Sequence, residues 1–524
     1  MKLTFLLFKS FSFSNFQKMT KTAFLTLCFS AALLACSPIQ EEKTPFVQQQ
    51  VIPGELPDPS MIEVDGVFYA TGSSNDWGPF YPIYQSKDLK NWDFVDYVFR
   101  EKPNWTLNSF WAPELFYKDG KFYCYYTARR TDGVSCIGVA STDDISKGFE
   151  DHGVIIEWGE EAIDAFVYQE GEDLYITWKA YGLTEGKPIQ LLGSKLSKDG
   201  LSLEGEAFEV VTAEAESWER GGIEGQTILE HDGYLYMLYS GNACCGANCD
   251  YQVGVARAKT MEGPWEKYDG NPILVGNENW KCPGHGTALQ KGEDWYYLYH
   301  AYPSTGFPNI GRTVLLSQIE WDKNKGWPYF NAESDRGLIV QDFRDDFDGN
   351  ELNPKWRFDV GIENVSYELS KRKLELKDDS NGQYPAFLGI SPDAANGTFE
   401  TIVEIGGDAL KSLTFYVTRD NNLGIGAQGD SLIIWKQSGG NWEELEKIEL
   451  EPSEKVYLNA QMKEGKEFVF SYSLDGNSWT DLATNVIGDN LAWWSWGMKA
   501  GISVKADSAT DNQMGSFEAF QIKY

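Results

Sequence analysis

The sequence contains little positive charge. Its 524 residues include 45 Lys and Arg against 78 Asp and Glu, so the formal net charge is −33. Because nucleic acids and anionic lipids are bound by stripes of Lys and Arg, this balance argues against both classes of partner.

Signatures of several common enzyme classes are absent too. The chain has no Gly-x-Ser-x-Gly turn for a serine nucleophile, no Gly-rich phosphate-binding loop and no dinucleotide-binding fingerprint. The histidines are His152, His231, His285 and His300. Serine or cysteine nucleophile chemistry therefore fits this sequence less well than chemistry based on carboxylates.

Long apolar runs are missing apart from one near the N-terminus. Residues 23–36 are apolar but too few to span a bilayer, and lysines precede them. The tetrapeptide Leu33-Leu34-Ala35-Cys36 resembles a bacterial lipobox, which implies cleavage before Cys36 and lipidation of its thiol. We therefore expect a lipoprotein signal peptide over residues 1–36 and a polar tether over 37–50. The mature protein would be lipid-anchored in the bacterial cell envelope, in the periplasm or at the outer-membrane surface.

Aromatic residues, in contrast, make up 15% of the chain, and a phrase of about fourteen residues occurs five times. Each copy is an apolar run, a polar turn with glycine, and a second run rich in Tyr, Leu and Ile, which predicts a β-hairpin. The turn glycines, which recur about every 50 to 60 residues, are Gly66, Gly120, Gly171, Gly233 and Gly292. A looser phrase follows each hairpin, so each repeat holds about four strands. The period predicts an all-β, five-bladed β-propeller over residues 51–335.

An ionisable residue stands near the start of each copy: Asp58, Glu114, Asp164, Glu224 and His285. The first strand of a propeller blade lines the central channel, so we expect these side chains to meet in one funnel. Cleavage of a glycosidic bond needs one carboxylic acid to protonate the leaving oxygen and one carboxylate to activate water or attack the sugar. A third acid nearby can keep the first one protonated. The alternative for any single acid is a turn cap or a solvent-facing side chain.

The loops that return to the funnel face carry aromatic residues. Trp77, Phe80 and Tyr181 lie in these loops, together with a cysteine-rich loop over residues 242–251. Aromatic faces beside carboxylates suit a sugar ring, which offers apolar C–H faces and hydroxyl edges. We expect Trp77 and Phe80 to contact substrate, with packing between blades as the alternative.

Six cysteines follow the signal region. Cys124 and Cys136 are expected on neighbouring strands, where a cross-strand disulfide is one prediction. Three disulfide connectivities are open to the other four, which are Cys244, Cys245, Cys249 and Cys282. A zinc site built from these thiolates and His285 is the alternative.

The pattern changes after about residue 335. Alternating strands separated by Asp, Asn, Gly and Ser turns predict a second domain over residues 340–524. We expect a β-sandwich of the jelly-roll, concanavalin-like type. Near its end, Trp493, Trp494 and Trp496 form either a sugar platform or buried packing, and we favour packing.

Several short motifs resemble glycoside hydrolase family 43, whose fold is a five-bladed propeller. In chain order they are Asp58-Pro59-Ser60-Met61-Ile62, Trp111-Ala112-Pro113-Glu114, Ile163-Asp164, Glu224-Gly225 and Gly284-His285-Gly286. The second domain is similar to the sandwich appended to many β-xylosidases and arabinofuranosidases of that family, where it lends a residue to the pocket or buttresses the propeller. Two positions depart from the family pattern, since Ala165 and Gln226 stand where the family commonly has proline.

The resemblance implies a role for each motif residue. It implies an inverting mechanism with Asp58 as general base, Asp164 as orienting acid and pKa modulator, and Glu224 as general acid. Trp111 and Glu114 would shape the substrate pocket, with Glu114 in a positioning role. His285 would lie near the channel axis, where a calcium ion coordinated mainly by water often sits, and Arg312 would contact substrate.

The leading hypothesis is an exo-acting hydrolase that releases a terminal pentose, β-D-xylose or α-L-arabinofuranose, from plant cell-wall oligosaccharides or polysaccharides such as hemicellulose fragments. Inversion predicts that the Asp58 and Glu224 carboxylates lie about 6.5–9.5 Å apart, with room for a water. Alternatives are an endo-acting arabinanase, another specificity of the family such as galactanase, and a surface lipoprotein that binds glycans without cleaving them.

Overall fold

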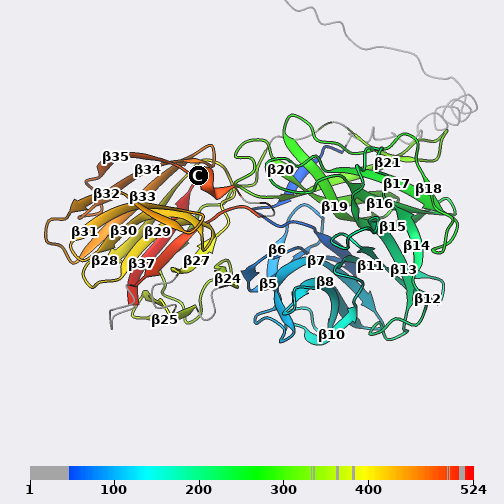
Figure 1. Cartoon of the computed structure of the whole chain (residues 1–524), viewed down its shortest axis with the longest axis horizontal. Helices are drawn as coiled ribbons and strands as arrows, with labels where there is room; N and C mark the ends of the chain where they lie inside the picture. Colours follow the sequence, from blue (N-terminus) through cyan, green and yellow to red (C-terminus); the bar gives the residue numbers. More distant parts are fainter. Residues whose placement is uncertain are drawn as a thin grey trace, which may run out of the picture. The chain divides into compact units, whose positions relative to one another are not determined.

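The computed structural model describes residues 46–524 apart from 332, 334–336, 362–364, 380–383, 493, 495 and 507–513 (Figure 1). The predicted signal peptide, the lipidation site at Cys36 and most of the predicted tether lie outside the described residues. Among the described residues, the helical element is one 3₁₀ turn, η1 (Asp489–Leu491), and no helix is long and apolar enough to cross a membrane. The prediction of an all-β fold is confirmed.

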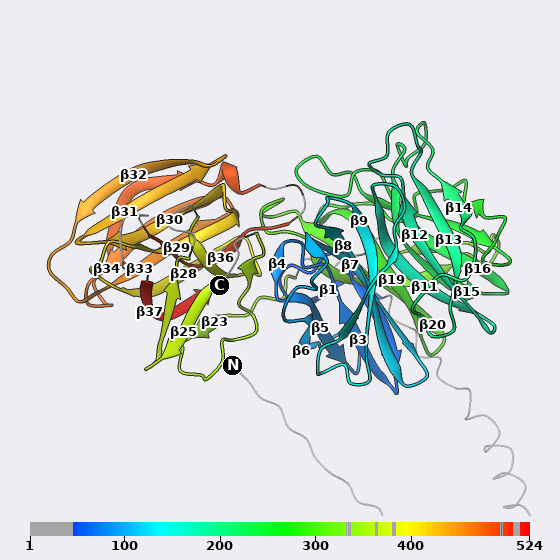
Figure 2. The same ribbon diagram turned by 60° about the horizontal axis from the view of Figure 1, so that its bottom comes forward.

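Five antiparallel sheets form the blades of a propeller (Figures 1 and 2). Four of them have four strands each, which are, blade by blade, β2 (Ser60–Val64), β3 (Val67–Thr71), β5 (Phe80–Ser86) and β6 (Asp93–Phe99); β7 (Thr106–Lys118), β8 (Lys121–Arg130), β9 (Ser135–Thr142) and β10 (Glu150–Ile156); β11 (Ala162–Glu170), β12 (Asp173–Ala180), β13 (Gln190–Leu196) and β14 (Phe208–Thr212); β15 (Ile223–His231), β16 (Tyr234–Gly241), β17 (Gln252–Ala258) and β18 (Glu266–Lys267). The fifth sheet contains β19 (Trp280–Lys291), β20 (Asp294–Pro303), β21 (Thr313–Trp321), β22 (Pro328–Phe330) and β1 (Gln49–Ile52). The first strands contact one another in a closed ring, β2–β7–β11–β15–β19 and back to β2. The prediction of five blades is confirmed.

The N-terminal strand β1 closes the propeller. It pairs with β21 of the last blade, and the Gln50 side chain donates a hydrogen bond to Thr313 Oγ1 at 2.6 Å. Gln49 and Gln50 therefore belong to the fold, whereas the predicted tether extended to residue 50. The error is physical in origin, because an edge strand that opens with polar residues looks like a linker until its pairing partner is known.

The hairpins turn at the predicted glycines. Gly66 and Gly120 have φ angles of 77° and 82°, a left-handed backbone that glycine adopts without steric cost. Each follows an aspartate in the same conformation, Asp65 and Asp119, which matches the tight turns that suit the twist of antiparallel strands.

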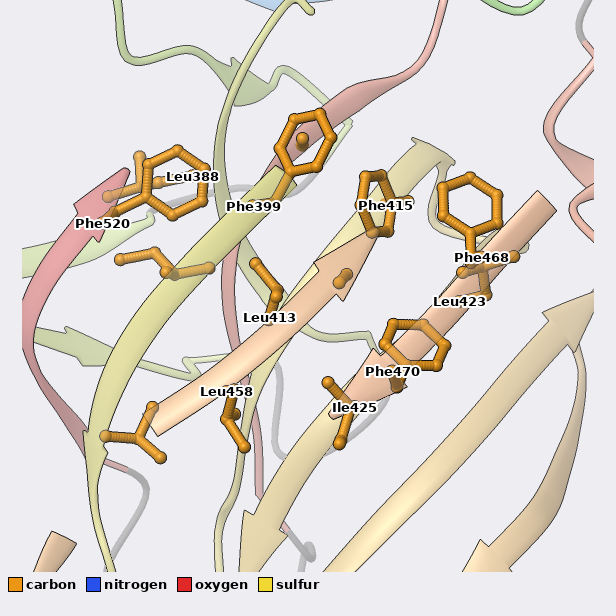
Figure 3. Packing of buried hydrophobic residues seen from close by; sticks show 14 of the residues in the cluster. Leu388, Phe399, Leu413, Phe415, Leu423, Ile425, Leu458, Phe468, Phe470 and Phe520 are labelled. Carbon is orange, nitrogen blue, oxygen red and sulfur yellow. The ribbon is translucent and has the colours of Figure 1, made fainter. Parts of the chain in front are cut away.

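The second domain is a sandwich of two antiparallel sheets. One contains β23 (Phe343–Asp345), β25 (Ser366–Ser370), β26 (Lys373–Lys377), β28 (Gly397–Glu404), β33 (Lys455–Lys463), β34 (Glu467–Ser473), β35 (Thr480–Ile487) and β37 (Met514–Lys523), and the other contains β27 (Ala386–Ile390), β29 (Leu410–Thr418), β30 (Asn421–Gln428), β31 (Ser431–Ser438), β32 (Asn441–Glu449) and β36 (Lys499–Lys505). Phe415 packs between Phe399 and Phe468, with ring centroids 5.0 and 4.3 Å apart (Figure 3). Phe415 comes from one sheet and the other two from the opposite sheet, so aromatic rings fill the space between the layers.

Specific contacts join the sandwich to the first blade. The two-residue strand β4 (Trp77–Gly78) pairs with β24 (Phe358–Asp359), and Arg357 donates to the Trp77 carbonyl oxygen at 2.8 Å. Lys499 forms an ion pair with Glu55 at 2.6 Å, with both side chains almost fully buried. These contacts seat the sandwich next to the segments that lead into the channel.

Candidate active site

A cavity of about 220 Å³ opens at the channel end of the first strands. Its lining includes the predicted Asp58, Asp164, Glu224, His285, Arg312 and Trp111. Arg129, Glu161 and Lys179 also line it, although the sequence did not single them out. The predicted funnel therefore exists, with a charged floor assembled from all five blades.

A repeated backbone distortion shapes this floor. The first strand of each of four blades is interrupted by a bulge, and the bulge residue has a left-handed backbone: Ala112 (φ 40°), Asp164 (φ 59°), Gly225 (φ 60°) and His285 (φ 38°). Asp58 (φ 51°) holds the equivalent place before β2. Left-handed non-glycine residues cost about 1–3 kcal/mol each and persist at functional sites, where the surrounding structure holds them.

The bulge also shows that the five ionisable residues do not all occupy the same position in their strands. Asp58, Asp164 and His285 occupy the left-handed position itself. Glu224 comes one residue before it, and Glu114 two residues after it, so their side chains leave the strand in other directions.

The amide of each left-handed residue is tied to the neighbouring blade. Asp164 donates to Thr127 Oγ1 at 3.1 Å, His285 donates to Ser240 Oγ at 2.7 Å, and Asp58 donates to His300 Nδ1 at 3.0 Å. The acceptors come from equivalent positions on the second strands of their blades, which are Thr127, Ser240 and His300. In the third blade the residue at this position is Lys179. A lysine has no acceptor, so there the Gly225 amide donates to Asp164 Oδ2 instead, at 3.1 Å.

Asp58 is held as a carboxylate. Arg312 Nη1 lies 2.9 Å from its Oδ1, and Ser73 Oγ donates to its Oδ2 at 2.5 Å. Burial alone would raise its pKa, but Arg312, with His300, His285 and the Ser73 hydroxyl, outweighs burial and holds the pKa of Asp58 well below its ordinary value. Asp58 therefore has the charge that a proton acceptor needs.

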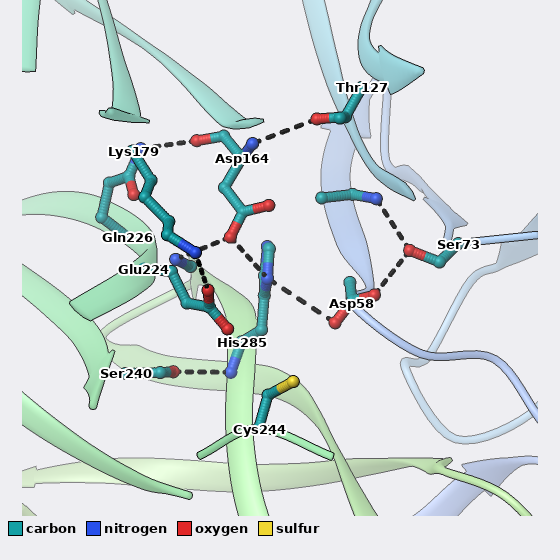
Figure 4. Close-up of polar contacts among 12 residues, drawn as sticks. Asp58, Ser73, Thr127, Asp164, Lys179, Glu224, Gln226, Ser240, Cys244 and His285 are labelled. Atoms are coloured by element: carbon teal, nitrogen blue, oxygen red, sulfur yellow. Dashed lines mark hydrogen bonds and ion pairs between the residues drawn. The ribbon is translucent and has the colours of Figure 1, made fainter. Parts of the chain in front are cut away.

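Asp164 and Glu224 form the second acidic centre (Figure 4). Lys179 Nζ lies 2.8 Å from Glu224 Oε2 and 3.1 Å from Glu161 Oε1, and Tyr251 donates to Glu224 Oε1 at 3.0 Å. Although burial opposes it, Lys179 holds the pKa of Glu224 below its ordinary value. Burial, reinforced by the neighbouring Glu224 carboxylate, raises the pKa of Asp164. In the ligand-free protein the proton of this pair therefore resides mainly on Asp164.

His285 lies between the two acidic centres. Its Nδ1 is 3.6 Å from Asp58 Oδ1 and 3.5 Å from Asp164 Oδ2. Among the described residues there is no group of three or more His, Cys, Asp or Glu side chains arranged to hold a metal ion. A calcium ion coordinated mainly by water needs few protein ligands, so the calcium expected beside His285 stays a prediction, and no chemical step below passes through a metal.

The walls of the cavity are apolar and differ from those predicted. Trp111 lines it as expected, with Trp494 of the sandwich edge-on to it at 6.1 Å and Arg129 over its ring at 5.6 Å. Trp494 is 55% exposed, so the prediction of buried packing is wrong for this residue. Trp496 is half-buried and donates to the Val417 carbonyl oxygen at 3.1 Å, while Trp493 lies outside the described residues.

Trp77 and Phe80 are not wall residues, which corrects their assignment to substrate binding. Trp77 is 3% exposed and packs on Phe387 and Tyr416 of the sandwich, and Phe80 packs on Phe110 with ring centroids 4.0 Å apart. Their loop docks against the second domain instead of reaching the rim. The sequence shows the loop but not the surface that covers it.

Glu114 lies behind the cavity wall and outside its lining. Its Oε2 accepts a hydrogen bond from Ser60 Oγ at 2.6 Å, which joins the first two blades. Burial raises the pKa of Glu114 to about 8, against the opposing effect of Ser60. Its place fits the expected positioning role but not direct contact with substrate.

The cysteine predictions resolve into two disulfides and two thiols. Cys244 is bonded to Cys245, and Cys249 to Cys282. Zinc ligation by these four residues is therefore wrong, because disulfide sulfurs are not thiolates. The predicted bridge between Cys124 and Cys136 is also wrong, since both are free and buried.

Comparison with known proteins agrees with this geometry. A family model described as glycosyl hydrolases family 43 matches residues 47–328, and one described as a β-xylosidase C-terminal concanavalin A-like domain matches residues 344–523. An extracellular endo-α-(1→5)-L-arabinanase of Bacillus subtilis is 28% identical over 299 residues, which cover 52% of this chain and 87% of the relative. A β-xylosidase of the same organism is 27% identical over 330 residues, covering 56% and 58% of the two chains. The crystal structure of a xylan β-1,4-xylosidase from Bacillus halodurans superposes with a TM-score of 0.79 at 19% identity, over 91% of this chain and 100% of the other.

Proposed function

Since the chain belongs to glycoside hydrolase family 43, we propose that it is an inverting, exo-acting enzyme that releases a terminal pentose from plant hemicellulose fragments. The observation that carries this proposal is the convergence of Asp58, Asp164 and Glu224 on one cavity of about 220 Å³. That volume is below the roughly 300–1,000 Å³ of pockets that bury drug-sized ligands, so it suits a single sugar ring. Trp494 adds a wall from the second domain, which favours a closed end over an open groove for a long chain.

In the proposed reaction, Asp58 accepts a proton from the water that attacks the anomeric carbon. Arg312 and Ser73 keep the Asp58 carboxylate ionised and oriented toward that water. Glu224 donates a proton to the glycosidic oxygen as the bond to the leaving sugar breaks. The predicted separation of about 6.5–9.5 Å between the two carboxylates stays a prediction.

The acid role requires the proton to move onto Glu224. Lys179 opposes this in the ligand-free protein, because its ammonium contacts the Glu224 carboxylate. Glu161 offers Lys179 a second partner at 3.1 Å. We propose that bound substrate turns Lys179 toward Glu161, which raises the pKa of Glu224 and lets it take the proton that Asp164 holds.

Among pentosides, the second domain favours β-D-xylosides. Its family model is described as belonging to β-xylosidases, and it supplies Trp494 to the cavity. The relatives also include a non-reducing end α-L-arabinofuranosidase of Bacteroides ovatus, 25% identical over 66% of this chain and 69% of the relative, so α-L-arabinofuranosides are the second substrate to assay.

The test is hydrolysis of 4-nitrophenyl β-D-xyloside, 4-nitrophenyl α-L-arabinofuranoside and xylobiose by the wild type and Glu224→Gln. We expect Glu224→Gln to lower kcat/KM by about 10²–10⁴-fold on xylobiose and less on the aryl glycosides, whose leaving group needs little protonation. Glu230→Gln, an exposed position on the same strand, is the matched control. Equal loss on all three substrates would remove Glu224 from the acid role. Proton NMR of the first sugar released from the β-xyloside should show the α-anomer, and a β-anomer would contradict inversion.

We also propose that the protein is lipid-anchored through Cys36 in the cell envelope. The tetrapeptide that ends at this residue supports the assignment. Metabolic labelling with a palmitate analogue should mark the wild type and not Cys36→Ser. Equal labelling of both would refute the anchor.

A further inference from the structure

The loop between β16 and β17, residues 242–251, places a disulfide between adjacent residues at the cavity. Cys244 and Cys245 are bonded to each other, and both line the same cavity as Asp58, Asp164 and Glu224.

The rest of the loop is fastened to the propeller by other bonds. Cys249 is linked to Cys282 of β19, across 33 residues of sequence. The Gly246 amide donates to the Tyr302 hydroxyl at 3.1 Å, and before the pair the Asn242 amide donates to the Glu219 carbonyl oxygen at 3.1 Å. The loop therefore has anchors on both sides of the adjacent pair.

These anchors leave the Cys244–Cys245 bond little part in holding the chain. A cross-link restricts the unfolded chain more as the loop it closes grows, and a bond between neighbours closes almost none. The bond changes the surface of the cavity instead. It converts two thiols, which are weak hydrogen-bond donors, into a polarisable sulfur face without a donor.

Such a face complements the floor of the cavity. The floor carries Asp58, Glu224, Lys179 and Arg312, which suit the hydroxyl edges of a sugar. Each face of a sugar ring also carries C–H groups, which need apolar contact. Trp111 and Trp494 supply part of that contact, and the sulfur pair is a further apolar wall contributed by the fourth blade.

We propose that the Cys244–Cys245 disulfide is a substrate-contacting platform that packs against C–H groups of the bound sugar, so that sugar binding depends on the oxidised state of this pair. The inference rests on the proposed function. It assigns this loop a role in recognition of the sugar, beyond any part in holding the chain.

The first test compares the wild type with Cys244→Ser/Cys245→Ser and with Cys244→Ala/Cys245→Ala. Cys136→Ala, at a buried free thiol outside the cavity lining, is the control for cysteine removal. We measure kcat and KM on 4-nitrophenyl β-D-xyloside and the inhibition constant of free xylose. Both double variants should raise KM and the xylose inhibition constant about tenfold, while kcat stays within about threefold of the wild-type value. The tenfold factor corresponds to the loss of apolar contact worth about two methylene groups.

The second test uses reduction of the unmutated protein. Dithiothreitol gives two electrons and two protons to the sulfur pair and becomes a cyclic disulfide, and mass spectrometry after alkylation identifies which bond was reduced. Reduction of Cys244–Cys245 with Cys249–Cys282 intact should raise KM as the double variants do. This measurement still decides the proposal if the variants fail to fold.

Each outcome bears on a definite claim. Unchanged KM and xylose inhibition after loss of the bond would overturn the platform, as would a fall in kcat alone, because that indicates a structural effect. A wild type inactive on every pentoside would refute the proposed function instead. In that case calorimetric titration of pentoses and hexoses into the wild type and the Ser double variant tests the platform, and equal affinity for each sugar would overturn it.

Discussion

The ion pair between Glu55 and Lys499 should control both stability and the placement of Trp494. The two side chains are 3% and 4% exposed, so solvent screens their 2.6 Å contact very little. Glu55 Oε1 also accepts the Gly497 amide at 2.7 Å, three residues after Trp494. A single carboxylate therefore holds the segment that presents Trp494 to the cavity.

The structure gives the size of the effect for each variant. Lys499→Met leaves the Glu55 charge buried without its partner, which costs about 3–5 kcal/mol. Glu55→Gln leaves the Lys499 ammonium in the same position and should cost a similar amount. The double variant removes both charges while the Gln carbonyl still accepts the Gly497 amide, so it should cost about 1 kcal/mol or less.

The assay is urea unfolding followed by tryptophan fluorescence, together with KM for 4-nitrophenyl β-D-xyloside. Each single variant should raise KM because Trp494 loses its support, and the double variant should return KM toward the wild-type value. The coupling energy from this cycle should exceed about 3 kcal/mol. Additive effects, with the double variant as destabilised as the two singles combined, would refute the reasoning.

Three further predictions concern the cavity. Lys179→Met should move the alkaline limb of the kcat/KM profile to higher pH, because Lys179 lowers the pKa of Glu224 and Glu224 must be protonated to act as the acid. A shift of this limb to lower pH would contradict the prediction. Arg312→Met should move the acidic limb of the kcat/KM profile to higher pH and lower kcat/KM by about 10²-fold or more. Arg312 lowers the pKa of Asp58, and Asp58 acts as a base only at pH values above that pKa. An unmoved limb would argue against Asp58 as the base. Trp494→Ala should raise KM for xylobiose with little effect on unfolding, and an unchanged KM would show that the sandwich takes no part in binding.

The repeated features of the fold were readable from the sequence. Gly66 and its four counterparts mark turns that require a left-handed backbone, so their period revealed the blades directly. Asp58, Asp164 and Glu224 were found because each opens a hairpin, and first strands must meet at the channel. Periodic, local signals of this kind survive without knowledge of tertiary contacts.

The errors occurred where a residue's environment depends on distant segments. Trp77 and Phe80 lie in a loop that faces the cavity in strand order, yet β24 of the second domain pairs with it and buries Trp77. Trp494 shows the reverse case, an aromatic residue of the sandwich that is exposed at the propeller's cavity. Lys179 was missed because one lysine in a strand carries no pattern, and only the ring of equivalent positions shows that it replaces Ser, Thr or His.

The displacement of Glu224 by one residue links the fold to the chemistry. In its blade the left-handed position belongs to Gly225, whose added Cβ would lie 2.7 Å from the His285 ring, so a carboxylate cannot occupy it without moving that ring. Glu224 therefore leaves the strand from the preceding position and meets Lys179 and Tyr251, whereas Asp58 and Asp164 both face His285. The bulge thus separates Glu224 from Asp58 and Asp164 and brings it to Lys179, the only lysine in the lining of the described cavity. In the ligand-free protein the pKa values of Asp58 and Glu224 are therefore both lowered, and the proton that the acid needs lies on Asp164, the neighbour of Glu224.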